Sequence, residues 1–400
     1  MIARLRRGLA GPPGVLALWA LLAVAAQRWW SWEDGVRLQF ASDSAFYETI
    51  ARAAPGLPDV DVLRAYAQRF PAHWLVGVLH DLTGIPLHDV YRVATAATLA
   101  LALLAVHRAL TATALPLRGY ALAIGSFAAS AYPVHYLLAS PGMLSDALFV
   151  LGVSVLLAGL VRGHAWVAVA GIALAMLGRQ TALPVALAAA AWVLLVPVWH
   201  PRRRAVAAAL VLVPLGLYAL LHLVSSPFSQ PREAGIDDLT ILGFATSAHE
   251  LGRHLGLVVL GIAVPVGLVV GARLRTGAPL PVGPLLVAGA IVAQPLLLGP
   301  LANRSNEPRL AGLAVPALAV AAGMLLRHAE LTRTETLVCA AAIAAGGLHH
   351  RYTWVGPAPN AGWALVELAA AAVVLAVLAW PAFSRRKGSV SIAETDRAPG

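Results

Sequence analysis

Long apolar runs separated by short polar links are the feature that most constrains the fold of this chain. The runs are about 15 to 20 residues long, and a helix needs that length to cross a hydrocarbon core of ~30 Å at ~1.5 Å per residue. Only 12% of the residues are charged and 59% are hydrophobic, whereas an ordinary soluble domain carries roughly 25% charged residues. The sequence therefore predicts an all-α integral membrane protein and argues against a water-soluble globular fold.

About twelve of these runs predict a polytopic bundle of transmembrane helices. They cover residues 14–26, 91–111, 119–139, 145–161, 165–177, 181–199, 205–224, 251–270, 281–301, 310–326, 336–348 and 363–380. The first run follows Arg4, Arg6 and Arg7 and could also belong to a secretory signal, but we interpret it as an uncleaved span. One transmembrane domain is thus expected over residues 1–384, followed by a polar tail, 385–400, that we expect to be disordered.

The net charge of +10 comes mainly from arginines in every second link between the runs. With a cytoplasmic N-terminus all these links are cytoplasmic, as the positive-inside rule requires, and most acids fall in the other links. The basic links hold Arg118, Arg162, residues 202–204, Arg273, Arg275, Arg327, Arg333 and residues 385–387. The pattern predicts a multi-pass protein of a bacterial inner membrane with both termini in the cytoplasm. It needs no nucleic acid partner and places any chemistry on the outer side.

The longest outer link, residues 28–90, contains two segments with apolar residues at helical spacing, 44–54 and 61–83. We expect both to be amphipathic helices that lie along the membrane face.

Asp43 immediately precedes the first of these segments, and Tyr47 follows one helical turn later. A carboxylate near the outer membrane surface is suited to act as a general base that takes a proton from an acceptor hydroxyl. The alternative is that Ser42 or Asp43 only caps the helix.

Two further charges stand at the outer ends of predicted spans. Asp146 opens the run 145–161, where it could bind substrate or simply cap the helix. Arg179 lies between two apolar runs on the outer side, against the positive-inside preference. It either extends to the interface or holds an anion.

Glu307 and Arg309 form a polar turn just before the run 310–326. Arg309 could offer a bidentate fork to a phosphate, with Glu307 orienting it or a sugar hydroxyl, or the two could form a plain surface pair. His350 and Arg351 add donors at another outer end, where an interfacial belt is the competing interpretation.

Several classes of site have no support in the sequence. Cys339 is the only cysteine, so an intramolecular disulfide is impossible. The histidines share no metal-ligand spacing, and no phosphate-binding loop, dinucleotide fingerprint or nucleophile elbow occurs. We therefore expect no zinc, no ATP-driven chemistry and no hydrolase triad.

Taken together, these short motifs resemble the GT-C class of membrane glycosyltransferases, which use polyprenyl-phosphate-linked sugars and include mannosyltransferases. Their order along the chain and their common outer placement carry the resemblance. The matching pieces are Asp43 with Tyr47, Arg69-Phe-Pro71, the segment from Ser145 to Phe149, the segment from Gly178 to Leu183, and the segment from Asn306 to Leu310.

The resemblance implies an inverting transfer of a hexose or pentose from a polyprenyl phosphate to an outer acceptor hydroxyl of a glycan, lipid or protein. Asp43 would be the catalytic base, and Arg179 and Arg309 would hold the phosphate. Sugar or acceptor contacts would come from Tyr47, Asp146, Glu307, His350 and Arg351. Many members carry a second acid beside the loop aspartate where this chain has Ser44, so a divalent metal is possible but has no support here.

The main alternative is a polytopic transporter or flippase for a lipid-linked or small solute. Such a protein needs charged or polar groups inside its spans, and Glu367 and His107 are the only candidates. This shortage favours the enzyme. A third interpretation, an assembly protein whose outer loops bind a partner, predicts that replacing Asp43 leaves function intact.

Overall fold

The computed structural model describes residues 11–29, 43–196, 201–230, 248–297, 307–348 and 361–395, and these are almost entirely helical. The first half contains α2 (Pro12–Trp29), α4 (Asp43–Ala53), α5 (Arg64–Ala67), α6 (Phe70–Thr83), α7 (Leu87–Thr111), α8 (Leu117–Ala128), the π-helix η1 (Ala131–Tyr136), α9 (Leu137–Ala139), the 3-10 turn η2 (Pro141–Met143), α10 (Leu144–Arg162), α11 (Ala165–Gly178) and α12 (Ala182–Leu195). The second half contains α13 (Arg203–Ser225), the 3-10 turn η4 (Ser226–Phe228), α16 (Ala248–Leu260), α17 (Ala263–Thr276), α18 (Val282–Leu297), α20 (Glu307–Gly312), α21 (Val315–Leu326), α22 (Arg333–Leu348) and α23 (Ala361–Thr395).

Four helical segments in the described residues are long and apolar enough to cross a membrane: Leu87–Thr111, Pro141–Arg162, Arg203–Phe228 and Ala364–Ala382. Two bent pairs raise the number to six if each pair is one span; they are Leu117–Ala128 with Ala131–Ala139, bent by 48°, and Gly252–Leu260 with Ala263–Thr276, bent by 75°. Shorter apolar helices, such as Ala165–Gly178, pack among them. This composition indicates a membrane-embedded helical protein, and the figure of about twelve spans stays a prediction.

Helix α10 is the centre of the bundle, because 83% of its most apolar stretch is buried, against 39% for α7 and 28% for α13. Its closest neighbour is α11, and glycines allow the close approach. A Cβ atom on Gly152 would lie 2.2 Å from the backbone nitrogen of Ala175, and one on Gly171 would lie 2.3 Å from that of Leu156. Small residues of this kind let helices associate in a membrane, where apolar burial alone gives no driving force.

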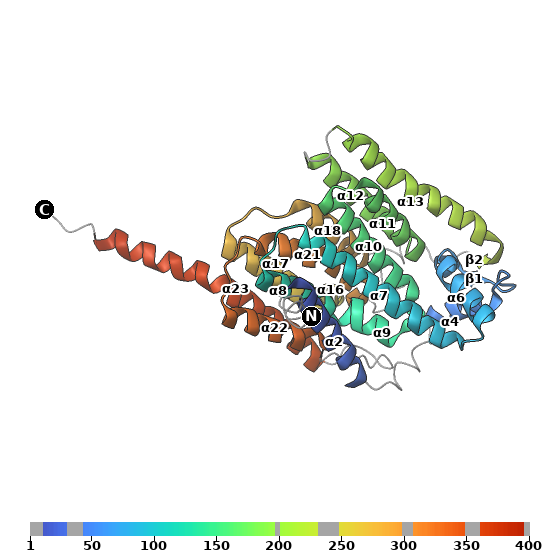
Figure 1. The fold of residues 1–400 in the computed structure, drawn as a ribbon, viewed down its shortest axis with the longest axis horizontal. Helices are drawn as coiled ribbons and strands as arrows, with labels where there is room; N and C mark the ends of the chain where they lie inside the picture. Colours follow the sequence, from blue (N-terminus) through green and yellow to red (C-terminus); the bar gives the residue numbers. More distant parts are fainter. Residues whose placement is uncertain are drawn as a thin grey trace, which may run out of the picture.

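The two amphipathic helices predicted in the first outer link are confirmed as helical, as α4 and as α5 with α6. A two-residue parallel strand pair fastens this segment to the end of α13, since β1 (Val62–Leu63) pairs with β2 (Ser229–Gln230). Figure 1 shows α4, α6 and both strands gathered at one end of α7 and α13. The segment is therefore held against the bundle.

The helices alternate in direction, so the links that the sequence separates by charge lie at opposite ends of the bundle. At one end, which we call the α6 end, His73 of α6 contacts the starts of α7 and α10, and Gln68, just before α6, contacts the end of α13. At the opposite end, Arg162 donates to the backbone oxygen of Arg108, and Arg275 pairs with Glu335 at 2.7 Å. These contacts agree with the two sets of links, basic and acidic, that the positive-inside rule separates in the sequence.

Helix α23 continues to Thr395, into the segment that the sequence predicts to be a disordered tail. Its C-terminal part projects away from the other helices (Figure 1). The N-terminal half of α23 packs against α17, because a Cβ atom on Gly267 of α17 would lie 2.8 Å from the backbone oxygen of Ala371 in α23.

Candidate functional site

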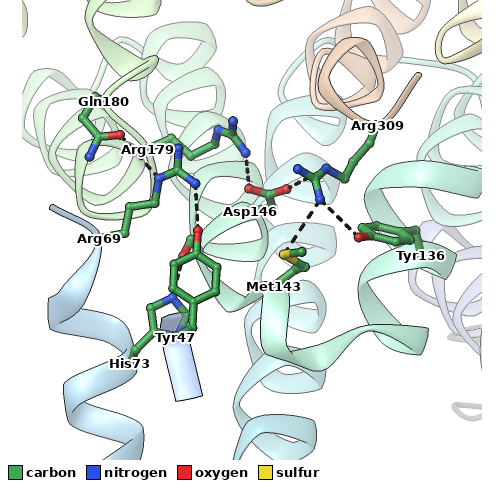
Figure 2. A network of polar contacts seen from close by, with 10 residues as sticks. Tyr47, Arg69, His73, Tyr136, Met143, Asp146, Arg179, Gln180 and Arg309 are labelled. Atoms are coloured by element: carbon green, nitrogen blue, oxygen red, sulfur yellow. Dashed lines mark hydrogen bonds and ion pairs between the residues drawn. The ribbon is translucent and has the colours of Figure 1, made fainter. Parts of the chain in front are cut away.

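Asp146 lies in the first turn of α10 with 2% of its surface exposed. No side chain caps this helix, whose N-cap residue is Met143, so the capping interpretation of Asp146 is wrong. Its carboxylate instead lies between two guanidinium groups (Figure 2). Arg179 Nη1 donates a hydrogen bond to Oδ1, and Arg309 Nε lies 3.5 Å from Oδ2. Two links that follow Asp146 in the sequence, one of them 33 residues further along, therefore meet at this carboxylate.

A third arginine, Arg69, completes what we call the arginine cluster: Arg69, Arg179, Arg309 and Asp146. Arg69 is the N-cap residue of α6, Arg179 follows the last residue of α11, and Arg309 belongs to α20. All three arginines are between 6% and 9% exposed. The interpretation of Arg179 as a side chain that extends to the interface is therefore wrong.

Aromatic and amide groups hold the guanidinium groups in place. Arg69 Nη1 donates to the Tyr47 hydroxyl at 2.7 Å, and its Nε donates to Gln180 Oε1 at 3.4 Å. On the other side of the cluster, Arg309 Nη1 donates to the Tyr136 hydroxyl at 3.1 Å. The predicted substrate residue Tyr47, only 1% exposed, thus reaches the cluster through Arg69.

The arginine cluster carries three positive charges and one negative charge. Burial lowers the pKa of Arg179, with repulsion from Arg69 and Arg309 in the same direction, and attraction to Asp146 offsets only part of this. At Arg69 burial also acts to lower the pKa, but attraction to Tyr47 and Asp146 outweighs it. Arginine stays protonated in proteins, so the cluster buries an excess of two positive charges.

One donor of the cluster points to a missing acceptor. Arg179 Nε is buried and has no hydrogen-bond partner among the described residues, and the same holds for Gln180 Nε2 beside it. Buried charges are costly unless they are paired and hydrogen-bonded. An anion with several acceptor oxygens would satisfy these donors and remove the charge excess.

His73 ties the helices around the cluster together. Its Nε2 lies 2.6 Å from the Ser145 hydroxyl, its Nδ1 lies 2.9 Å from the Tyr91 hydroxyl, and its ring stacks on Tyr47 at 3.9 Å. Burial lowers the pKa of His73 to about 3, with repulsion from Arg69 in the same direction, so the imidazole is neutral. The Tyr91 hydroxyl donates to the backbone oxygen of Tyr47 at 3.2 Å. These contacts fit a neutral His73 that carries its proton on Nδ1, donates it to the Tyr91 hydroxyl, and accepts a hydrogen bond from the Ser145 hydroxyl at Nε2.

Glu307 and Arg309 are 4% and 6% exposed, so the interpretation of a surface pair is wrong. Glu307 Oε1 lies 3.2 Å from His254 Nδ1, whereas Arg309 faces Asp146. Both residues lie in the first turn of helix α20, but their side chains reach different partners, and Glu307 forms a second buried contact beside the cluster.

The remaining predicted residues are less fully described. Helix α4 begins at Asp43 and packs against α6 and η2, so its first residue lies one turn before Tyr47. The Asp43 side chain, His350 and Arg351 lie outside the described residues. The described residues contain no group of three or more His, Cys, Asp or Glu side chains that could hold a metal ion.

Sequence reasoning assigned no role to Arg69, His73 or Tyr136. Arg69 and His73 are four residues apart, which places them on one face of a helix. That spacing is a signal from which their proximity could be predicted. Tyr136 follows a bend that the sequence does not reveal.

Comparison of the chain with family models, with curated proteins and with solved structures finds no match in any of the three. Function is therefore argued from the site itself.

Proposed function

We propose that this chain is an inverting membrane glycosyltransferase that moves a sugar from a polyprenyl-phosphate donor to an acceptor hydroxyl on the extracytoplasmic side. The observation that carries the proposal is the buried excess of two positive charges in the arginine cluster, with an unpartnered donor on Arg179. A phosphate group supplies both the charge and the acceptor oxygens that the cluster lacks.

The proposed reaction uses these charges on the leaving group. The acceptor oxygen attacks the anomeric carbon from the face opposite the phosphate, and a new carbon–oxygen bond forms as the bond to the phosphate oxygen breaks. The electron pair of the broken bond stays on the lipid phosphate. Guanidinium groups fixed in a dry site stabilise this developing negative charge more strongly than water does.

The acceptor proton passes to Asp43 in this proposal. Support comes from the position of α4, which begins at Asp43 and packs against η2, the turn that leads directly into Asp146 and α10. Tyr47, one turn further along, contacts Arg69 of the cluster. The base and the phosphate-binding groups would therefore flank one space.

A lipid-linked donor fits the apolar helices that surround the cluster. The sugar phosphate would lie at the α6 end while its polyprenyl chain extends along exposed apolar side chains such as Leu75, Leu79 and Val93, which are between 40% and 69% exposed. Because the donor arrives already activated, the reaction needs no nucleotide-binding motif.

The test is turnover by the purified full-length protein with a panel of polyprenyl-phosphate sugars and acceptor sugars. Asp43→Asn should reduce turnover by roughly 10²- to 10⁴-fold, because an amide does not accept the proton. Asp59→Asn removes an exposed carboxylate of the same loop and should leave turnover unchanged. Unchanged turnover in Asp43→Asn would remove Asp43 as the base, and no transfer from any donor would overturn the proposal.

A transporter or flippase for a lipid-linked or small solute is the second candidate, and one observation favours it. The two bent helix pairs meet near Glu367, a buried carboxyl inside a candidate span. Reconstituted vesicles distinguish the two candidates, since a flippase moves the intact lipid-linked sugar between leaflets without cleaving it, whereas the enzyme releases free polyprenyl phosphate.

A further inference from the structure

Glu367 lies in α23 about one turn inside the candidate span Ala364–Ala382. Its side chain is 6% exposed, and it forms no hydrogen bond or ion pair with any described residue. Tyr132 on η1 is its titratable neighbour through space. A lone carboxyl in this position stands in contrast to Asp146, which has two guanidinium partners.

The Glu367 side chain lines a small cavity where two helix breaks meet. Ala129 and Ser130 come from the break between α8 and η1, and Gly261 comes from the break between α16 and α17. The cavity has a volume of about 20 Å³, which is enough for one water molecule or an ion of similar size. Breaks in membrane helices free backbone carbonyl groups from their intrahelical partners, and such groups coordinate cations.

Two serine side chains supply further oxygen atoms to a lining that otherwise consists mainly of apolar residues. Ser126 Oγ donates to the backbone oxygen of Ala123 at 2.8 Å, and Ser130 Oγ donates to that of Phe127 at 2.5 Å. Both hydroxyl protons are therefore used within the helix, and the oxygen lone pairs remain for a cation or a donor. The glycines of α22 allow this helix to approach the break between α8 and η1 closely, because a Cβ atom on Gly347 would lie 1.5 Å from the backbone oxygen of Ala129.

We infer that this cavity is a binding site for one monovalent cation, with Glu367 as its charged ligand and Ser126, Ser130 and backbone oxygens at the breaks as neutral ligands. The described residues that line it include no Lys, Arg or His, and a bound cation would balance the charge of the carboxylate. One carboxylate matches one positive charge, and a divalent ion would leave a charge uncompensated. The small volume favours Na⁺, with a proton as competitor for the same carboxyl.

The site links elements that also position the arginine cluster. Helix η1 carries Tyr136, which accepts a hydrogen bond from Arg309. A Cβ atom on Gly312 of α20 would lie 2.8 Å from Tyr132 Cβ, so α20 packs directly on η1. A bound cation would hold both helix breaks in one arrangement and so stabilise the fold around the cluster.

The test measures the melting temperature of the full-length protein in detergent at pH 8, in NaCl or in N-methylglucamine chloride of equal ionic strength. Na⁺ should raise the melting temperature saturably by about 2–4 °C. Glu367→Gln should abolish this rise, Ser130→Ala should shift it to higher Na⁺ concentration, and Glu330→Gln, which alters an exposed acid at the opposite end, should retain it.

An equal response of wild type and Glu367→Gln to Na⁺ would overturn the inference. So would a wild-type melting temperature that depends on pH but not on Na⁺, because the carboxyl then only takes a proton. If Glu367→Gln does not fold, equilibrium binding of ²²Na⁺ to the wild-type protein decides the matter. About one ion per chain, displaced by lowering the pH, is the expected result, and absence of binding contradicts it.

Discussion

The two ends of the helical bundle both carry arginines, but they use them differently. At the α6 end, Arg69, Arg179 and Arg309 are buried and share one carboxylate. At the opposite end, Arg118 and Arg162 are exposed and donate to the backbone oxygens of Leu331 and Arg108. The presence of an arginine at a helix end therefore does not by itself indicate an anion-binding site. Burial of the guanidinium group, and fewer carboxylates than arginines around it, do indicate one.

The physical difference is solvation. Water and salt screen the exposed arginines of the opposite end, so their positive charges have little influence beyond their own contacts. Charges at the α6 end are removed from water and interact through a medium of lower effective dielectric constant. In the part of the chain that the structure describes, that end alone combines buried positive charge with a donor that lacks an acceptor.

Removing one carboxylate from each end should reveal the largest difference between the two ends. Asp146→Asn leaves three buried arginines without their anion, so it should cost about 3–5 kcal/mol of unfolding free energy. Glu335→Gln removes the partner of Arg275, whose side chain is 12% exposed and at the edge of the bundle, and should cost about 1 kcal/mol or less. Denaturation of both variants in one detergent measures the difference. Equal losses would mean that Asp146 carries no special share of the charge balance.

Phosphate should stabilise the protein through the α6 end alone. At a hundred times its dissociation constant, inorganic phosphate should add about 2.7 kcal/mol to the unfolding free energy of the wild-type protein. Arg179→Gln should lose most of this gain, and Arg162→Gln at the opposite end should keep it. The comparison uses sodium phosphate against sodium chloride at equal sodium concentration. A gain that survives in Arg179→Gln would contradict an anion site in the cluster.

The third expected effect appears only in acid and concerns His73. The pKa of this histidine is near 6.5 when the chain is unfolded and about 3 when it is folded, so the unfolded state binds the extra proton between these values. Stability is therefore complete above pH 6.5 and falls by about 1.4 kcal/mol per pH unit as the pH drops towards 3.

His73→Gln should flatten this part of the stability profile, and His164→Gln, which alters an exposed histidine at the opposite end, should not. Unfolding measured across pH 4 to 7 provides the comparison. A profile that is unchanged in His73→Gln would show that other groups cause the acid sensitivity.

Much of the site could be predicted because the helices alternate in direction. Asp146 and Arg179 are separated by one helical hairpin, α10 with α11, so their side chains return to the same end. Arg309 follows several further crossings and meets them for the same reason. Counting apolar runs was therefore enough to group these three residues on one side.

Other parts of the site could not be read in this way. Arg69 reaches the cluster because the first loop is held by the β1–β2 pair and by contacts such as that of Gln68 with His222 at 3.2 Å. These contacts join residues more than 150 positions apart. The helix breaks that surround Glu367 fall inside runs that are, by length and composition, apolar enough to be taken as single spans.

The sequence by itself determined the helical, membrane-embedded character of the protein, the two sets of links and the chemistry available at each. These properties depend on local composition and on period along a single helix. The tertiary structure alone decided which charges are buried, which are paired, and that three arginines share one carboxylate while Glu367 has no counter-charge among the described residues. Burial and charge balance depend on distances between segments remote in sequence, and packing sets those distances.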